Sequence, residues 1–238
     1  MLKKTKIDWC DCTLNPVVGC PRGCEYCYAR KQNDRFKWVA DWTKPQFFPE
    51  RLEALKSKKS KSIFMDSMSD IEFWRESDVR ETINLIKKYP QHIYLFLTKS
   101  WHVPYNLFFY HVFEQNKQNK STINQKTDDA IIGQNVFIGR TITGNTQFTF
   151  TDNYNFDFLS AEPILEKIDL NLQSGKQLKL IIIGAETGNR KGKVIPKKEW
   201  IDSLVKQADD NKISVFMKES LRKIMGDEFR QDKLPWQK

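Results

Sequence analysis

Seven short runs rich in β-branched or aromatic residues recur along the 238-residue chain, and they constrain its fold more than any other feature. Such runs are typical of strands buried within a parallel sheet. In chain order they are NPVVGC, SIFMDS, HIYLFLTK, NVFIGRT, FDFLSAEP, KLIIIGAE and ISVFMKE.

Helical patterns lie between several of these runs. In SDVRETINLIKKYP, Ser77 is a candidate N-cap and apolar residues follow at helical spacing. In IPKKEWIDSLVKQADDN, Pro196 suits a first turn. Trp200, Leu204 and Ala208 repeat at helical spacing in the same segment. Strands that alternate with helices predict an α/β fold built as a parallel sheet or barrel.

We expect the chain to form one domain over residues 1–238, because 39% of its residues are hydrophobic and can fill a sizeable core. Two interruptions stand out. The polar segment Glu114–Asp129 predicts a flexible surface loop. The interval TGNTQFTFTDNYN is a poor helix former, so one crossover helix is expected to be rudimentary.

Polar residues follow most of the seven runs. In a βα barrel the strand ends converge on one face, where active sites lie. A single polar strand end is explained by contact with solvent, whereas a set of carboxylates and lysines indicates a ligand or partner. The residues are Asp66, Ser67, Ser69, Asp70, Thr98, Lys99, Arg140, Thr141, Glu162, Glu186, Lys218 and Glu219.

The composition also bears on location and partners. No apolar run is long enough to span a membrane and the Lys-rich start lacks the features of a signal peptide, so we expect a cytoplasmic protein with reduced thiols. The net charge is +9, which favours polyanionic partners. Solvated lysines without a binding role explain the charge equally well.

Three of the five cysteines lie within the segment CPRGCEYC, at C-x3-C-x2-C spacing. Thiolates at Cys20, Cys24 and Cys27 suit zinc or an iron–sulfur cluster. A structural zinc site normally takes four ligands, and Cys10 or Cys12 could supply the fourth. Three thiolates on a four-iron cluster would instead leave one iron open to a substrate or cofactor.

The cysteine motif, with the aromatic Tyr26 before its last cysteine, resembles that of radical S-adenosylmethionine (SAM) enzymes. The blocks TKIDWCDCTLNPVVGC, CEYCYA, DSMSD, LTK, FLSAEP, GAETG and FMKE resemble those of a phage- and bacterium-associated radical-SAM-like family of unknown function. The resemblance extends from about Lys6 to Lys218. The CxYCY ending is also similar, more distantly, to spore photoproduct lyase.

The resemblance implies a partial (βα) TIM-like barrel of the radical SAM type, with mostly parallel strands and a core of about residues 6–220. Cys20, Cys24 and Cys27 would hold a four-iron, four-sulfur (4Fe-4S) cluster whose fourth iron binds SAM. An electron from a donor such as flavodoxin or ferredoxin would cleave SAM to methionine and a 5′-deoxyadenosyl radical. That radical would remove a hydrogen atom from the substrate.

Cofactor contacts follow from the same resemblance. Tyr26 would pack near the adenine of SAM. Ser67, Ser69 and Asp70 would contact its amino group, for which polar side chains are chemically suited. Glu186 would bind the ribose or the substrate.

The resemblance also implies residues that act on the substrate. Glu162 would bind the ribose or the substrate, and Lys99 and Lys218 would meet an anionic substrate group. No ligand role is assigned to Cys10 and Cys12. Packing or no role is expected for them, and the alternative is a thiol that donates a hydrogen atom to a product radical.

Two basic segments could meet a polyanion. KSKKSKS precedes the second predicted strand and is interpreted as a solvated loop. GNRKGKVIPKK follows the sixth, so its basic residues are expected to contact phosphate near the active site. They are Arg190, Lys191, Lys193, Lys197 and Lys198. We therefore predict a nucleotide or nucleic-acid substrate rather than a small neutral metabolite.

Together these features predict a radical SAM enzyme that acts on a nucleobase, nucleotide or nucleic acid, by base modification, rearrangement or lesion repair. The alternative is a non-enzymatic zinc or iron–sulfur module that binds nucleic acid. A third hypothesis is an inactive relative that keeps the cluster for structure.

Overall fold

The computed structural model describes residues 2–100, 135–144, 156–170 and 178–237. The predicted polar loop at 114–129 lies outside the described residues, as does most of the interval predicted to lack a helix. The chain divides into two compact units, Met1–Phe137 and Ile138–Lys238, and each is described by itself. The prediction of one domain over 1–238 stays a prediction.

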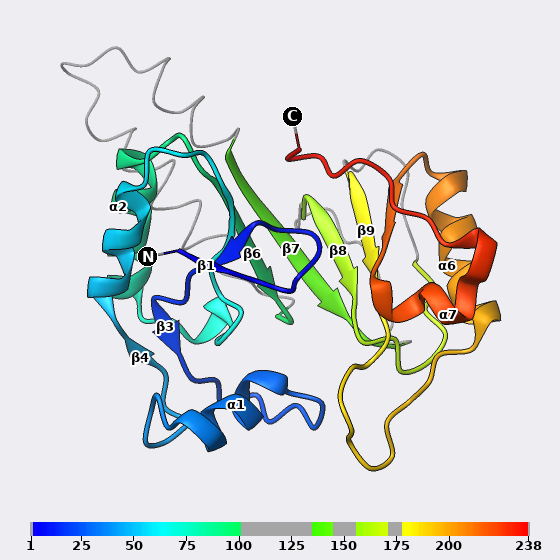
Figure 1. The fold of residues 1–238 in the computed structure, drawn as a ribbon, viewed down its shortest axis with the longest axis horizontal. Coiled ribbons are helices and arrows are strands. Elements are labelled where there is room, and N and C mark those ends of the chain that lie inside the picture. Colours follow the sequence, from blue (N-terminus) through cyan, green and yellow to red (C-terminus); the bar gives the residue numbers. More distant parts are fainter. Residues whose placement is uncertain (1, 101–134, 145–155, 171–177, 238) are drawn as a thin grey trace. The chain divides into compact units, whose positions relative to one another are not determined.

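The first unit contains a mainly parallel sheet (Figure 1). Strands β2, β5 and β6 are parallel neighbours in that order, and β1 pairs antiparallel with the outer edge of β2. Most residues of β5 and β6 are buried, which explains the uninterrupted apolar runs of the sequence there. The strands are β1 (Lys3–Lys4), β2 (Cys12–Thr13), β5 (Ser62–Phe64) and β6 (Ile93–Thr98).

The first of the seven predicted strands is not part of this parallel sheet. β3 (Val17–Val18) pairs antiparallel with β4 (Gln46–Phe47) in a two-stranded sheet of their own. The first parallel strand is β2, in which only two residues pair with β5. The prediction was wrong here because a two-residue strand carries no hydrophobic periodicity.

Two α-helices and two 3-10 helices complete the described part of the first unit. In α2 (Glu76–Lys88) the buried face contains Val79, Ile83 and Ile86, as helical spacing predicts. The predicted N-cap was wrong, because Arg75 occupies the cap position and Ser77 lies inside the first turn. The other elements are α1 (Tyr28–Phe36), η1 (Pro49–Lys56) and η2 (Ile71–Phe73).

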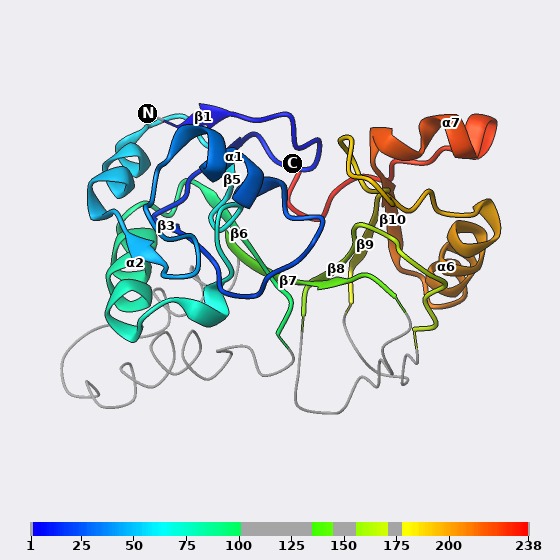
Figure 2. The same ribbon diagram turned by 90° about the horizontal axis from the view of Figure 1, so that it is seen from below.

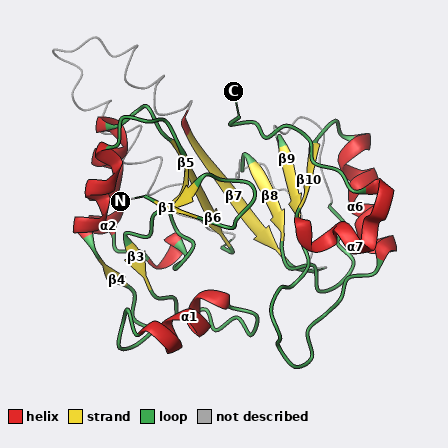
Figure 3. Cartoon of the chain, viewed as in Figure 1, coloured by secondary structure: helices red, strands yellow, loops and turns green. Residues whose placement is uncertain are grey.

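The second unit is a parallel sheet covered by helix α6 (Figure 3). Its neighbouring strands β7, β8, β9 and β10 are all parallel, and every residue of β8 and β9 is buried. The strands are β7 (Val136–Ile142, in this unit from Ile138), β8 (Phe158–Ala161), β9 (Leu180–Ile183) and β10 (Ser214–Met217). Short helices follow: η4 (Glu219–Leu221), α7 (Arg222–Met225) and η5 (Gly226–Glu228).

Helix α6 (Lys198–Asp210) packs against β10 (Figure 2). Its buried residues are Ile201, Leu204 and Ala208. Trp200, which the sequence placed on this face, is only half-buried, because the buried stripe is rotated by one residue. Pro196 precedes the cap residue Lys197 rather than lying in the first turn.

The pairing of β7 with β8 in the second unit requires a glycine. Gly139 on β7 lies directly opposite Phe158 on β8. The ring of Phe158 occupies the space where a Cβ atom at position 139 would lie. The same ring contacts Trp236, with 5.2 Å between the ring centroids.

The predicted α/β class with mostly parallel strands is confirmed in both units. Six of the seven predicted runs form strands of parallel sheets. Among the described helices, none combines the length and apolar character that a membrane crossing requires.

Candidate metal centre and strand-end carboxylates

The cysteine loop, residues 19–27, connects β3 to α1 in the first unit. Gly19 begins it with φ of +113°, a conformation that side chains disfavour. A Cβ atom here would lie 2.9 Å from the Trp42 carbonyl oxygen and 3.0 Å from the Pro45 Cα atom. The next residue, Cys20, donates its backbone N–H to the same Trp42 carbonyl at 2.7 Å. Glycine at this position therefore allows the chain to place Cys20.

All three cysteines of this loop are half-buried, and none of the five cysteines, which all lie in the described part, forms a disulfide. Cys27 caps α1: its Sγ accepts the N–H of Arg30 at 3.3 Å. Its own N–H donates to the Cys24 carbonyl at 3.1 Å. Helix N-termini favour negative charge, so this position suits a metal-bound thiolate.

Cys20 has both apolar and charged neighbours. Together with Cys27 it packs against a buried cluster of Val18, Ala29, Val39, Trp42 and Met68. Burial, reinforced by the charges of Asp70 and Cys24, raises the pKa of the Cys20 thiol to about 11, although Arg22 opposes the shift. A metal at this position would have to displace the thiol proton.

Across the described ranges, no group of three or more His, Cys, Asp or Glu side chains could hold one metal ion. A single ion requires all its donors to converge on one point. A four-iron cluster instead bonds each thiolate to a different iron. The three thiols of this loop are half-buried, and two of them, Cys20 and Cys27, have an apolar backing.

Arg22, between the first two cysteines, anchors the loop to the end of β5. Its Nε lies 3.2 Å from Asp70 Oδ2, and its Nη2 donates to Glu72. The guanidinium also lies over the ring of Phe73, 5.2 Å from the centroid. The loop is therefore held by a cation with three partners.

Asp70 is the centre of the polar network at this end of the sheet. It is 5% exposed and caps η2, accepting the N–H of Glu72 at 3.2 Å. Its other hydrogen bonds come from the end of β6: the Thr98 hydroxyl at 2.7 Å and the Lys99 N–H at 3.1 Å. With Arg22, these contacts connect the cysteine loop to two strand ends.

Tyr26 and Lys99, two predicted site residues, lie together. The Lys99 ammonium is 5.8 Å from the centroid of the Tyr26 ring, within the range of a cation–π contact. Both side chains are half-buried.

Ser67 and Ser69 have partners within the unit. The Ser67 hydroxyl donates to Asn15 Oδ1 at 3.0 Å, and the same oxygen accepts the N–H of Met68 at 2.9 Å. The Ser69 hydroxyl accepts from the indole N–H of Trp74 at 2.9 Å. Both serines remain half-buried at the end of β5.

Asp66 is a second buried carboxylate at this end of the sheet. It accepts the Leu97 N–H, at 3.1 and 3.3 Å to its two oxygens. Burial raises the pKa of Asp66 well above its usual range, and the charge of Asp70 raises it further. Asp66 therefore holds the ends of β5 and β6 together.

The other two cysteines lie away from the loop in sequence. Cys12, on β2, is 2% exposed and donates its thiol to the Ser62 carbonyl at 3.7 Å. Burial, with the charge of Asp11, raises its pKa to about 11. Cys10 is half-buried and donates to the Ile7 carbonyl at 4.0 Å. The burial of Cys12 agrees with a packing role.

The second unit has charged residues of its own at the strand ends. Glu162, after β8, accepts a hydrogen bond from the ammonium of Lys218, after β10. The two side chains meet beside Gly184, the residue directly after β9. A Cβ atom at Gly184 would lie 3.0 Å from Lys218 Cδ and 3.2 Å from Glu162 Cγ. The structure thus brings together two of the predicted substrate-binding residues.

Glu186, after β9, is 5% exposed and binds the Arg190 guanidinium through both oxygens, at 2.7 and 2.8 Å. Arg190 was expected to contact phosphate together with Lys191 and Lys193. The structure instead pairs it with Glu186, and both lysines stay exposed.

Two residues of this candidate site were missed by sequence reasoning. Arg22 lies inside the cysteine motif, and its charge next to three thiols was a usable signal. Asn15 carried no comparable signal, because its partners are about fifty residues away in sequence.

A family model described as "Protein of unknown function (DUF5131)" matches residues 4–229. No curated protein and no solved structure matches the chain.

Proposed function

Since the chain belongs to this DUF5131 family of proteins of unknown function, we propose its function from its own residues. We propose that it is a radical SAM enzyme that abstracts a hydrogen atom from a nucleobase, nucleotide or nucleic acid. The proposed fold is the partial barrel typical of such enzymes. One observation carries the proposal: three half-buried cysteines, none in a disulfide, share a loop anchored by Arg22.

Cys20, Cys24 and Cys27 would hold a 4Fe-4S cluster. When bound, such a cluster supplies the electron that cleaves SAM. The start of α1 favours the thiolate of Cys27, and the apolar cluster behind Cys20 excludes water from that side.

SAM is proposed to lie over the same loop. Tyr26 offers a half-buried ring for the adenine, and Lys99 beside it offers a charge for a carboxylate or phosphate. Ser67, Ser69 and Asp70 stay the proposed contacts of the SAM amino group. Asp70 additionally orients the cysteine loop through Arg22.

The substrate proposal is supported by the net charge of +9 and by the exposed Lys191 and Lys193. Glu162, Lys218 and Glu186 are proposed to bind the substrate or the SAM ribose.

Anaerobic reconstitution with iron and sulfide tests the enzyme proposal. The protein should turn brown, retain about four irons per chain, and release 5′-deoxyadenosine from SAM under a strong reductant. Colourless, zinc-loaded protein that never cleaves SAM would support the nucleic-acid-binding module instead. Iron retention without SAM cleavage would indicate an inactive relative.

Variants identify the ligands. Cys24→Ala should lose the cluster absorbance and SAM cleavage. Cys10→Ala is the matched control, because Cys10 is also a half-buried thiol near the N-terminus, and it should keep both. Equal loss of iron in the two variants would mean that a fourth thiolate closes the cluster, and the proposed open iron would not exist.

A further inference from the structure

Exposed apolar side chains are concentrated on one short segment of the first unit. Of the four large hydrophobic side chains exposed in the described part of the chain, three lie within residues 28–38. Tyr28 is 49% exposed, Phe36 54% and Trp38 38%. The fourth is Ile195, in the second unit. The segment comprises α1 and the turn after it, and Cys27 caps its start.

Two of these rings form a stacked pair. The centroids of Phe36 and Trp38 are 5.2 Å apart, with 27° between the ring planes. The guanidinium of Arg35 lies 5.1 Å from the centroid of the Phe36 ring. Three flat, exposed groups therefore lie close to the Phe36 ring or form it: a cation, a phenyl ring and an indole.

The turn that presents the rings is fixed by buried groups. Lys37 ends α1 in a left-handed conformation with φ of 51°. Asn33, 3% exposed, donates to the Val39 carbonyl and accepts the Val39 N–H, both at 3.0 Å. Val39 is buried in the cluster behind the cysteine loop. Trp38 is thus held between two anchored residues, so the ring pair is pre-organised.

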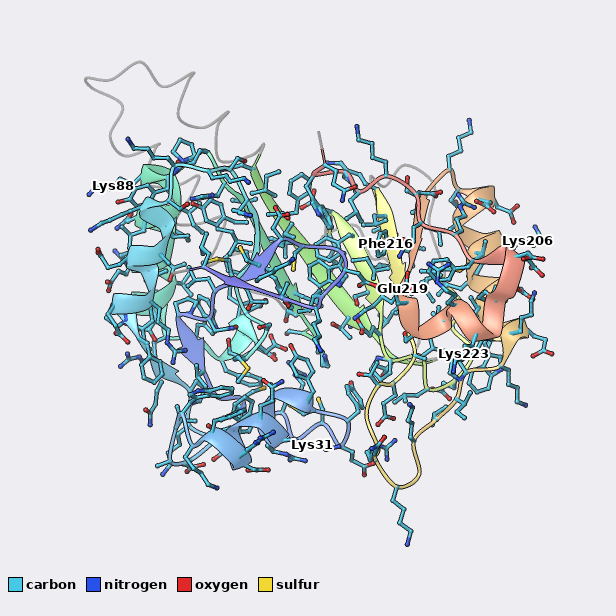
Figure 4. All side chains as sticks on the ribbon, in the orientation of Figure 1. Lys31, Lys88, Lys206, Phe216, Glu219 and Lys223 are labelled. Carbon is cyan, nitrogen blue, oxygen red and sulfur yellow. The ribbon has the colours of Figure 1, made fainter. Side chains whose placement is uncertain are left out.

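This segment carries more positive than negative charge. Residues 28–38 contain four basic residues against one acidic residue. Within the described ranges, Lys31, Arg35 and Lys37 take part in no ion pair, whereas on α6 Lys206 is paired with Asp210 at 2.6 Å and on α2 Arg80 with Glu76 at 2.7 Å. Figure 4 labels Lys31 on α1 and Lys206 on α6.

We propose that Lys31, Arg35, Phe36, Lys37 and Trp38, called the α1 patch, bind single-stranded nucleic acid. Bases stack on exposed aromatic rings and on guanidinium planes whatever their sequence, and neighbouring cations meet the phosphates. Binding of a single strand would make single-stranded nucleic acid the substrate class of the proposed enzyme. Only this assignment of the strand as substrate rests on the proposed function.

An acidic protein, such as an electron donor, is the other partner that positive charge would attract. The stacked rings favour the nucleic acid, because a charge-steered protein contact does not require two stacked exposed rings. Duplex DNA is also disfavoured, because its bases are already stacked on one another and cannot stack on the rings.

Fluorescence anisotropy of a labelled oligo(dT) tests the inference on the full-length chain, both as iron-free protein and after cluster reconstitution. Trp38→Ala and Phe36→Ala should each raise the Kd on the order of ten-fold. Trp38→Phe should restore binding, because it keeps a ring. Arg35→Ala should reduce the slope of log K against log salt by about 0.7.

Two controls have matched chemistry outside the α1 patch. Ile195→Ala removes an exposed apolar side chain and Lys206→Ala an exposed, ion-paired cation. Both should bind like the wild type. Circular dichroism should show the same unfolding midpoint for every variant that is compared.

Unchanged Kd values in Trp38→Ala and Phe36→Ala would overturn the inference, as would variants that lose affinity for flavodoxin but not for oligo(dT). Patch-dependent binding by protein that never cleaves SAM would keep the inference and remove the proposed function. SAM cleavage without patch-dependent binding would do the reverse.

Discussion

At the scale of single residues, Gly19 combines two constraints. Its φ of +113° is unfavourable for side chains, and the Trp42 carbonyl leaves no space for a Cβ atom. Gly19→Ala should therefore lower the free energy of unfolding by about 2–3 kcal/mol, measured by urea denaturation, and should weaken iron retention because Cys20 shifts.

Gly188→Ala is the control for this prediction. Gly188 also has a positive φ, of 83°, but nothing lies within 4 Å of a Cβ atom there. Gly188→Ala should lower the free energy of unfolding only by the strain of the positive φ, about 1 kcal/mol. If both variants lost the same stability, the close approach of Trp42 would have no energetic role.

Asp66 predicts a pH dependence. Its pKa is raised in the folded protein, so the native state holds the proton more tightly than the unfolded chain. Stability should therefore fall as the pH rises above about 4, the ordinary aspartate pKa. Asp66→Asn, which keeps an oxygen for the Leu97 N–H, should remove a slope of up to about 1.4 kcal/mol per pH unit. Urea denaturation of iron-free protein between mildly acidic and neutral pH measures this, and identical slopes would contradict it.

At the scale of elements, the cysteine loop depends on one side chain that reaches the end of the sheet. Arg22→Ala removes one partner of Glu72 and one of the contacts of Asp70. We expect the free energy of unfolding to fall by about 1–3 kcal/mol. We also expect faster proteolysis within residues 19–27 and weaker iron retention. Arg30→Ala, which removes a basic residue from α1, should change none of these. A loop equally resistant to protease in both variants would show that Arg22 is dispensable.

The elements also show what sequence patterns can predict. Runs such as KLIIIGAE were recognised because β9 is buried throughout and needs an unbroken apolar stretch. The two-residue strands β1 and β2 were missed because they are defined by pairing alone. The start of α2 was placed two residues late, because a serine inside the first turn resembles a cap.

At the scale of the whole molecule, a bound cluster should couple to folding. Its thiolate bonds exist only in the folded state, so reconstituted protein should unfold at a higher temperature than the same protein after the cluster is lost. Scanning calorimetry measures the difference, which Cys24→Ala should abolish. Identical curves with and without iron would contradict a specific site.

The candidate site shows the limit of sequence reasoning. The three cysteines could be identified because they are neighbours in the sequence. Tyr26 came from the family resemblance, whereas Lys99 was also identified as a polar strand end, and the contact between them depends on the fold. The ion pair of Arg190 with Glu186 was not predicted, because the sequence shows which residues are charged but not which of them pair.

Gly139 and Phe158 have a consequence for how relatives of this chain can vary. The two positions share one volume, so a side chain at 139 is compatible only with a smaller residue at 158. Family members with alanine or a larger residue at the first position should have lost the aromatic ring at the second. An alignment would then show the two positions changing together, as a record of this strand pairing in the evolution of the family.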